Sequence, residues 1–109
     1  MVITLDEAEY FRQLGYDLAN GYDKVGWLKV SENGIQKFKA MTEEEIRKEV
    51  KDLKYTNQWS YQVSNAIEIH LEPEHLKPYD FVIKFLELES YVIDGFVDAI
   101  YNLIGVGNE

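Results

Sequence analysis

The last third of the chain constrains the fold more than any other segment. Residues 79–104 are the most apolar stretch, and the polar side chains within it recur every three or four residues. That spacing predicts one long helix over residues 79–104, with Pro78 near its first turn. Its polar stripe consists of Lys84, Glu87, Tyr91, Asp94, Asp98, Tyr101 and Asn102. Because this stripe is narrow, the rest of the chain has to cover most of the helix.

Three alternatives for this segment stay open. The helix could break near Ser90 or near Gly95, or residues 81–88 could form a buried strand that leaves only residues 90–104 helical. If the other elements fall short of covering a long helix, the remaining apolar patch would be an interface with a partner or with a second copy of the chain.

Two further segments begin with a capping box, in which a threonine is followed three residues later by a glutamate. These boxes are Thr4–Glu7 and Thr42–Glu45. Apolar residues at helical spacing follow each box, so we expect helices over residues 5–19 and 43–54. Gly21, which follows an asparagine, is a suitable stop for the first of these helices.

Alternating segments predict an antiparallel sheet. Residues 25–30 and 35–40 flank Asn33–Gly34, a dipeptide typical of tight turns, which favours a β-hairpin. Over residues 59–71 the apolar side chains fall on odd positions, and this period of two predicts one bulged strand or two consecutive strands. A tight hairpin at Ser64–Asn65 is the alternative, although it would mix apolar and polar side chains on one face.

We therefore expect a single α+β domain spanning residues 1–109. A small antiparallel sheet of three or four strands would pack against three helices, with the C-terminal helix long and mostly buried. A chain of 109 residues is close to the usual size of one domain, and its 46% hydrophobic residues can fill one core. No linker or internal repeat divides the sequence.

The chain contains no cysteine, which excludes disulfides, thiolate metal sites and cysteine nucleophiles. Its first residues lack a basic region before an apolar run, so we expect no signal peptide. No apolar run reaches the length that crosses a bilayer. Together with the absence of disulfides, these features favour a cytoplasmic protein.

The charge is strongly negative, with a formal net charge of −9. The acidity is uneven, because residues 55–109 contain nine acidic side chains and only Lys77 and Lys84 as bases. Such a chain repels nucleic-acid phosphates and anionic membranes, so we expect it to bind neither directly. It attracts a cationic partner, whose approach its field would accelerate.

Two groups of residues could carry chemistry. His70, Glu72 and His75 are weak candidates for a metal site, since imidazole and carboxylate groups bind zinc. Their spacing matches no metalloenzyme motif, and a solvated loop over residues 72–78 is the simpler interpretation. The carboxylates of the polar stripe could act as acid and base only if burial separated their pKa values. The sequence has no nucleophile elbow and no phosphate-binding loop, so we expect no catalysis and no cofactor.

These observations favour a non-catalytic protein that binds a basic surface of a partner and inhibits or regulates it. The expected target is the nucleic-acid-binding surface of an enzyme. Small acidic inhibitors from mobile elements and toxin-neutralising immunity proteins have a similar length and charge. The alternatives are a toxin-neutralising immunity protein, a structural homo-oligomer and a small metal-dependent enzyme that uses residues 70–75. The expected partner-binding residues are Glu72, Glu74, Glu87, Tyr91, Asp94, Asp98 and Tyr101.

Overall fold

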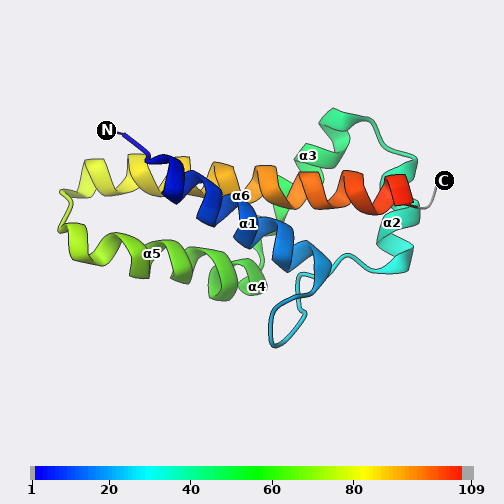
Figure 1. Ribbon diagram of the computed structural model, residues 1–109, viewed down its shortest axis with the longest axis horizontal. Helices are drawn as coiled ribbons and strands as arrows, with labels where there is room; N and C mark the ends of the chain where they lie inside the picture. The colour runs from blue at the N-terminus through cyan, green and yellow to red at the C-terminus, as the bar shows by residue number, and fades with distance from the viewer. Residues whose placement is uncertain (1, 107–109) are drawn as a thin grey trace.

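The computed structural model describes residues 2–106, and this part of the chain is helical and contains no strand (Figure 1). The helices are α1 (Leu5–Asn20), α2 (Glu32–Lys39), α3 (Glu43–Asp52), α4 (Asn57–Trp59), α5 (Asn65–Leu71) and α6 (Pro78–Val106). Short 3₁₀ turns cover Leu53–Tyr55 and Glu72–Glu74, and a π-helical turn covers Ser60–Ser64. The predicted α+β fold with an antiparallel sheet is therefore wrong.

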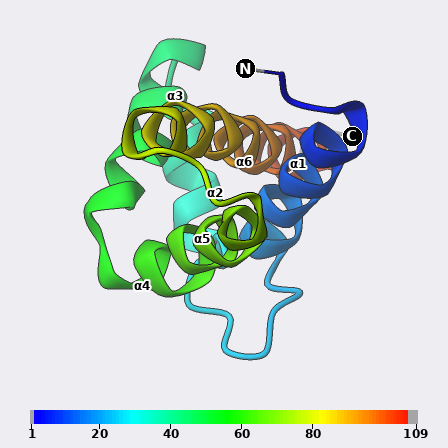
Figure 2. The same cartoon turned by 90° about the vertical axis from the view of Figure 1, so that its left-hand side faces the viewer.

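The long C-terminal helix is confirmed and sets the dimensions of the molecule. Its 29 residues correspond to about 43 Å at the usual helical rise, close to the longest dimension of 47 Å. α6 is continuous, so neither the break near Ser90 or Gly95 nor the strand over residues 81–88 occurs. α1 crosses α6, α5 lies beside its N-terminal half, and α2 and α3 pack on its C-terminal half (Figures 1 and 2).

Two glycines allow α1 and α6 to cross closely. A Cβ atom added at Gly15 would overlap the carbonyl oxygen of Val92, and one added at Gly95 would overlap that of Arg12. Each glycine therefore faces the backbone of the opposite helix, where no side chain fits. This reciprocal contact places α1 across the middle of α6.

Both capping boxes are confirmed. The Thr4 hydroxyl accepts from the Glu7 amide at 3.1 Å, and the Glu7 carboxylate accepts from the Thr4 amide at 3.1 Å. The second box joins Thr42 and Glu45 by the same two bonds, at 3.2 and 3.0 Å. The expected stop is also present, since Gly21 has a φ of 77° directly after α1.

The predicted hairpin over residues 25–40 is wrong because its turn residues begin a helix. The Ser31 hydroxyl accepts from the Gly34 amide at 3.0 Å, which makes Ser31 the cap of α2. The segment before it is a loop, in which Leu28 is buried and Trp27 is exposed. A serine followed three residues later by a glycine amide fits a helix start as well as a turn, and here the cap forms.

The predicted strands over residues 59–71 are also wrong, because only every second odd position faces the core. The buried side chains are Trp59, Val63, Ile67 and Leu71. The odd positions between them, such as Tyr61 and Ile69, are exposed. An α-helix has 3.6 residues per turn, so residues four apart drift by about 40° around its axis. The π-helical turn at Ser60–Ser64, which is wider than an α-helical turn, lies within this segment.

The core lies along the buried sides of α6. The Trp59 and Phe96 rings lie with centroids 6.4 Å apart, and Phe11 of α1 is fully buried against the same cluster. α3 adds Ile46 and Val50 to this core. Every α-helix except the short α2 therefore contributes a buried side chain.

Candidate partner-binding surface

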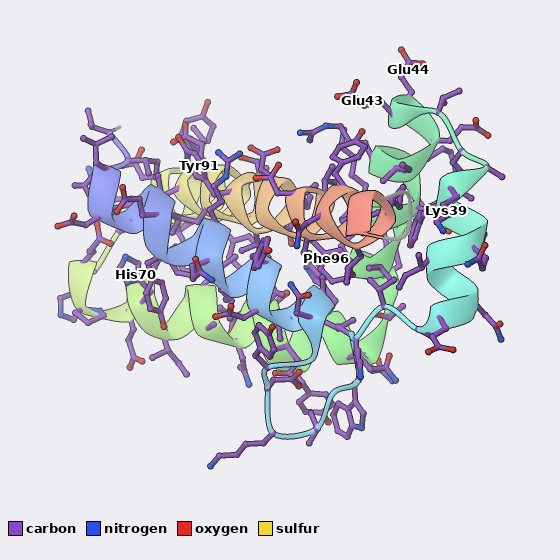
Figure 3. All side chains as sticks on the ribbon, turned by 45° about the vertical axis from the view of Figure 1, so that its right-hand side comes forward. Lys39, Glu43, Glu44, His70, Tyr91 and Phe96 are labelled. Carbon is purple, nitrogen blue, oxygen red and sulfur yellow. The ribbon has the colours of Figure 1, made fainter. Side chains whose placement is uncertain are left out.

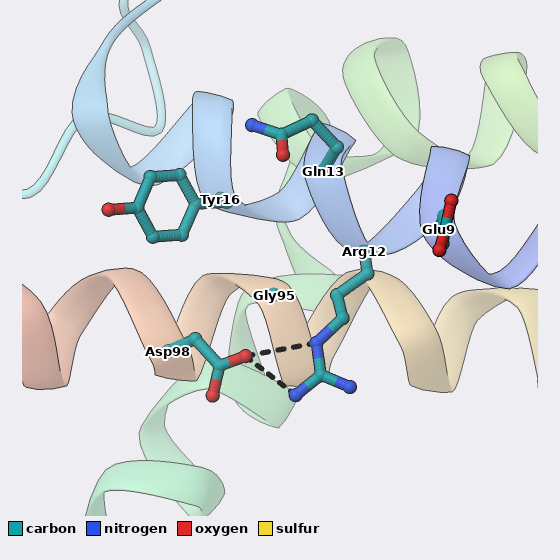
Figure 4. Close-up of a pocket in the computed structure, with 6 residues that line it drawn as sticks. All are labelled: Glu9, Arg12, Gln13, Tyr16, Gly95 and Asp98. Atoms are coloured by element: carbon teal, nitrogen blue, oxygen red, sulfur yellow. Dashed lines mark hydrogen bonds and ion pairs between the residues drawn. The ribbon is translucent and has the colours of Figure 1, made fainter.

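The C-terminal part of the predicted polar stripe of α6 lies between α1 and α3, and two of its carboxylates are neutralised within the chain. Arg47 of α3 donates to Asp94 at 2.7 Å. Arg12 of α1 donates to one oxygen of Asp98 through Nε at 3.0 Å and Nη2 at 2.7 Å (Figure 4). These ion pairs hold α6 to both neighbouring helices. Neither carboxylate is therefore presented alone to a partner.

The Arg12–Asp98 pair spans a shallow depression at the α1–α6 crossing. The depression has a volume of about 350 Å³ and is lined by Glu9, Arg12, Gln13, Tyr16, Gly95 and Asp98 (Figure 4). The hydrogen bonds from Arg12 to Asp98 and the attraction between their charges raise the pKa of Arg12 above its usual value. Because both side chains are about half exposed, this pair adds little to stability.

The two tyrosines of the stripe differ in exposure. Tyr91 is half-buried and packs against the core, whereas Tyr101 is exposed. Partial desolvation, together with the negative charges of Glu43 and Asp98, raises the pKa of Tyr101. Figure 3 shows Glu43 at the start of α3, where its side chain is exposed.

The three predicted glutamates also differ. Glu72 is exposed and Glu87 is half-buried, and neither forms an ion pair with any of residues 2–106. Glu74 instead accepts from Lys84 at 2.7 Å. Of the five predicted carboxylates, those of Glu72 and Glu87 are thus available to an outside cation.

The predicted metal ligands do not come together as expected. Among the described residues, His70 belongs to a group of possible ligands with Glu7 and Glu74 rather than with Glu72 and His75. Its Nε2 lies 2.7 Å from Glu7 of α1. His70, Glu7 and Glu74 form a cluster whose nearest N and O atoms all lie within 4.8 Å of one another. The Lys84 ammonium lies 3.2 Å from Glu7 and 2.7 Å from Glu74. Lys84 therefore neutralises the carboxylates that a metal ion would need.

Contacts within this cluster shift the pKa values of Glu7 and Lys84. Partial burial by itself raises the pKa of Glu7, but hydrogen bonds from His70, the Thr4 amide and Lys84 lower it to about 2. Burial lowers the pKa of Lys84, yet its bonds to Glu74 and Glu7 raise it above the usual value. The cluster joins α1, α5 and α6 at one end of the molecule.

One surface feature was missed in the sequence, although its spacing could have revealed it. Along α6, side chains spaced alternately four and three residues apart form a continuous heptad row, which we name the α6 seam. The seam consists of Tyr79, Ile83, Leu86, Ser90, Ile93, Val97, Ile100 and Ile104. Other apolar residues lie between these positions, so the polar stripe is the more obvious pattern and the heptad spacing is easily overlooked.

The two halves of the α6 seam have different environments. Ile93 and Ile100, in the C-terminal half, are 7% and 1% exposed. In the N-terminal half, Tyr79 is 76% and Leu86 is 55% exposed, and Val82 at the edge of the seam is 54% exposed. α3 lies beside the C-terminal half of α6 and does not extend along the N-terminal half (Figure 1). Ile83 is half-buried. The chain thus leaves most of this N-terminal half uncovered, and we call the stretch from Tyr79 to Leu86 the bare half of the α6 seam.

The described helices include none that could cross a bilayer, since even α6 is not apolar enough over a sufficient length. We compared the chain with models of protein families, with curated proteins and with solved structures, and none of the three comparisons found a match.

Proposed function

We propose that this protein is a non-catalytic binding module that occupies a basic surface of a partner protein and thereby inhibits or regulates it. The carrying observation is the net charge of −9, which the internal ion pairs leave unchanged because each joins one cation to an anion of the same chain. Within residues 2–106, carboxylates without an ion pair remain on α6 and on the turn before it, at Glu72, Asp80 and Glu87. The protein acts in the cytoplasm, as a chain without cysteines favours.

The preferred target is a surface that binds nucleic acid. Such surfaces are rich in lysine and arginine, because they neutralise phosphates and release counterions. Carboxylates on a rigid helix can take the place of some of those phosphates, and a strong negative field speeds the encounter. Asp94 and Asp98 are instead paired within the chain, with Arg47 of α3 and Arg12 of α1.

The test starts with affinity capture from the source organism's lysate, with identification of the retained proteins. We expect a basic, nucleic-acid-binding protein whose retention falls with added salt and is competed by duplex DNA. The association rate of the purified pair should decrease steeply between low and physiological ionic strength. A retained partner that is insensitive to both salt and DNA would contradict the proposal.

A pair of matched variants separates local charge from total charge. The double substitution Glu72→Gln with Glu87→Gln should weaken the complex about tenfold, the value of two exposed ion pairs. The control, Glu9→Gln with Glu32→Gln, removes the same charge from exposed positions on α1 and α2. We expect the control to weaken binding much less. Equal losses in both variants would mean that only the overall charge matters.

A further inference from the structure

The chain itself shows what kind of element covers the α6 seam. α3 packs on the C-terminal half of α6 and buries Ile46 and Val50, which lie four residues apart on one helical face. Arg47, next to this apolar row, reaches Asp94 of α6 at 2.7 Å. The covering element is thus an amphipathic helix whose arginine pairs with an acid beside the seam.

The same acidic position recurs toward the start of α6. Asp94 follows the seam residue Ile93, and at intervals of seven residues Glu87 follows Leu86 and Asp80 follows Tyr79. Neither Glu87 nor Asp80 forms an ion pair within the described part of the chain. The bare half therefore repeats the apolar and acidic pattern that α3 occupies further along, without the matching cation.

From this repetition, and resting on the function proposed above, we propose that the bare half of the α6 seam is the docking site for an amphipathic helix of the partner. The docking helix presents apolar side chains four residues apart to Tyr79, Val82, Ile83 and Leu86. Arginine or lysine residues beside that row pair with Asp80 and Glu87. It lies on α6 as α3 does, so that the two helices cover successive halves of one seam.

The charge favours this occupant over a second copy of the chain. Two copies meeting through this face would bring Asp80 and Glu87 of both chains to the edges of one contact. Each copy also carries a net charge of −9, which opposes self-association. A basic helix avoids both penalties, because its cations pair with Asp80 and Glu87 and its positive charge is attracted to the acidic chain. Its apolar row covers Leu86.

The test uses two synthetic helical peptides as probes. One has leucines at positions i, i+4, i+7 and i+11 with arginines beside them, and the other has glutamates in place of the arginines. Binding to the full chain is measured by fluorescence anisotropy, and the contact is mapped by NMR of labelled methyl groups. We expect the arginine peptide to bind at least about tenfold more tightly. Its shifts should centre on the methyls of Val82, Ile83 and Leu86.

Matched variants locate the contact. Leu86→Ser should weaken the arginine peptide about tenfold, through lost apolar burial, and Glu87→Gln about threefold. The controls are Ile69→Ser and Glu68→Gln, which change an exposed isoleucine and an exposed glutamate on α5. Both controls should stay within about twofold of the unchanged protein. Circular dichroism and urea unfolding confirm that all four variants fold.

Three outcomes would overturn this proposal. Binding that Leu86→Ser leaves unchanged would place the contact elsewhere, and equal binding of both peptides would remove the role of the acids. A dimer in sedimentation that Leu86→Ser dissociates would assign the face to a second copy. The docking site and the proposed function can fail separately. A captured basic partner whose binding depends on salt but not on Leu86 refutes the docking site alone. Lack of binding by both the peptides and any basic partner refutes both.

Discussion

Glu7 uses its two carboxylate oxygens for two separate tasks. Oε1 accepts from the Thr4 amide and hydroxyl and closes the capping box of α1. Oε2 accepts the contacts from His70 and Lys84. The same side chain therefore starts a helix and joins it to segments more than sixty residues away in the sequence. Lys84, which is only 6% exposed, depends on Glu7 and Glu74 for its charge balance.

The lowered pKa of Glu7 predicts a loss of stability in acid. Because its pKa is about 2 in the folded chain and near 4.5 otherwise, the ionised carboxylate stabilises the fold above pH 4.5. That contribution, up to about 3 kcal/mol, disappears as the pH falls from 4.5 toward 2. Glu7→Gln should therefore lower the free energy of unfolding at pH 7 and make little difference at pH 2. Urea unfolding of both proteins at several pH values measures this difference.

Glu9→Gln is the matched control, since Glu9 lies on the same helix and is exposed. Its effect on the free energy of unfolding should be small and nearly independent of pH. A difference between Glu7→Gln and the unchanged protein that stays constant from pH 7 to pH 2 would show that the Glu7 charge does not stabilise the fold.

Among the helices, the crossing of α1 and α6 depends on the absence of side chains at Gly15 and Gly95. In isolation, glycine in the middle of a helix costs about 1 kcal/mol relative to alanine. Both helices contain such a glycine despite this cost, and α6 is continuous through Gly95. The gain is a close backbone contact at the centre of the molecule, next to the buried Val92 and Phe96.

Gly95→Ala should destabilise the protein although alanine is the better helix former. The added methyl group would overlap the Arg12 carbonyl, so the helices must separate, at a net cost of about 1–3 kcal/mol. Gly105→Ala is the control within the same helix, because no neighbouring segment of the described chain lies within 4 Å of its Cβ position. The control should leave thermal stability unchanged or slightly raised. Similar melting temperatures for both variants would contradict a tight crossing.

Across the whole molecule, the elements from α3 to α5 are held by burial against α6. Trp59 is fully buried near Phe96, and its Nε1 donates to the buried carboxylate of Glu89 at 3.1 Å. This contact joins α4 to the middle of α6. At the bare half of the α6 seam, by contrast, no other element of the described chain buries the side chain of Leu86, which is exposed.

Phe96→Ala tests whether this centre carries the stability of the whole chain. Removing a buried aromatic ring should lower the free energy of unfolding by about 3–5 kcal/mol, which denaturant titration can measure. The control, Tyr55→Ala, removes a ring that is 78% exposed and should change that free energy by less than about 1 kcal/mol. A loss below about 1 kcal/mol for Phe96→Ala would show that the ring lies outside the core.

Local features of this protein could be predicted from the sequence. The two capping boxes, the stop at Gly21 and the full length of α6 depend on residues within one or two turns of each other. Their hydrogen bonds are satisfied locally, so distant segments do not change them. Ser31 shows the limit of local patterns. The same few residues fit both a helix cap and the predicted tight turn, and the cap is what forms.

The remaining features depend on neighbours that are far away in the sequence. The odd positions of residues 59–71 fit both a strand and a helix, and only packing against α6 shows that every second one is buried. The partners of Asp94 and Asp98 lie on α3 and α1, and no local pattern identifies them. Hydrogen bonding within a helix is local, whereas burial and ion pairing require two surfaces to meet. Three helices, α1, α3 and α6, could therefore be recognised from local patterns, whereas α2, α4 and α5 were predicted as strands. The bare face of α6 became visible only once the other helices had packed.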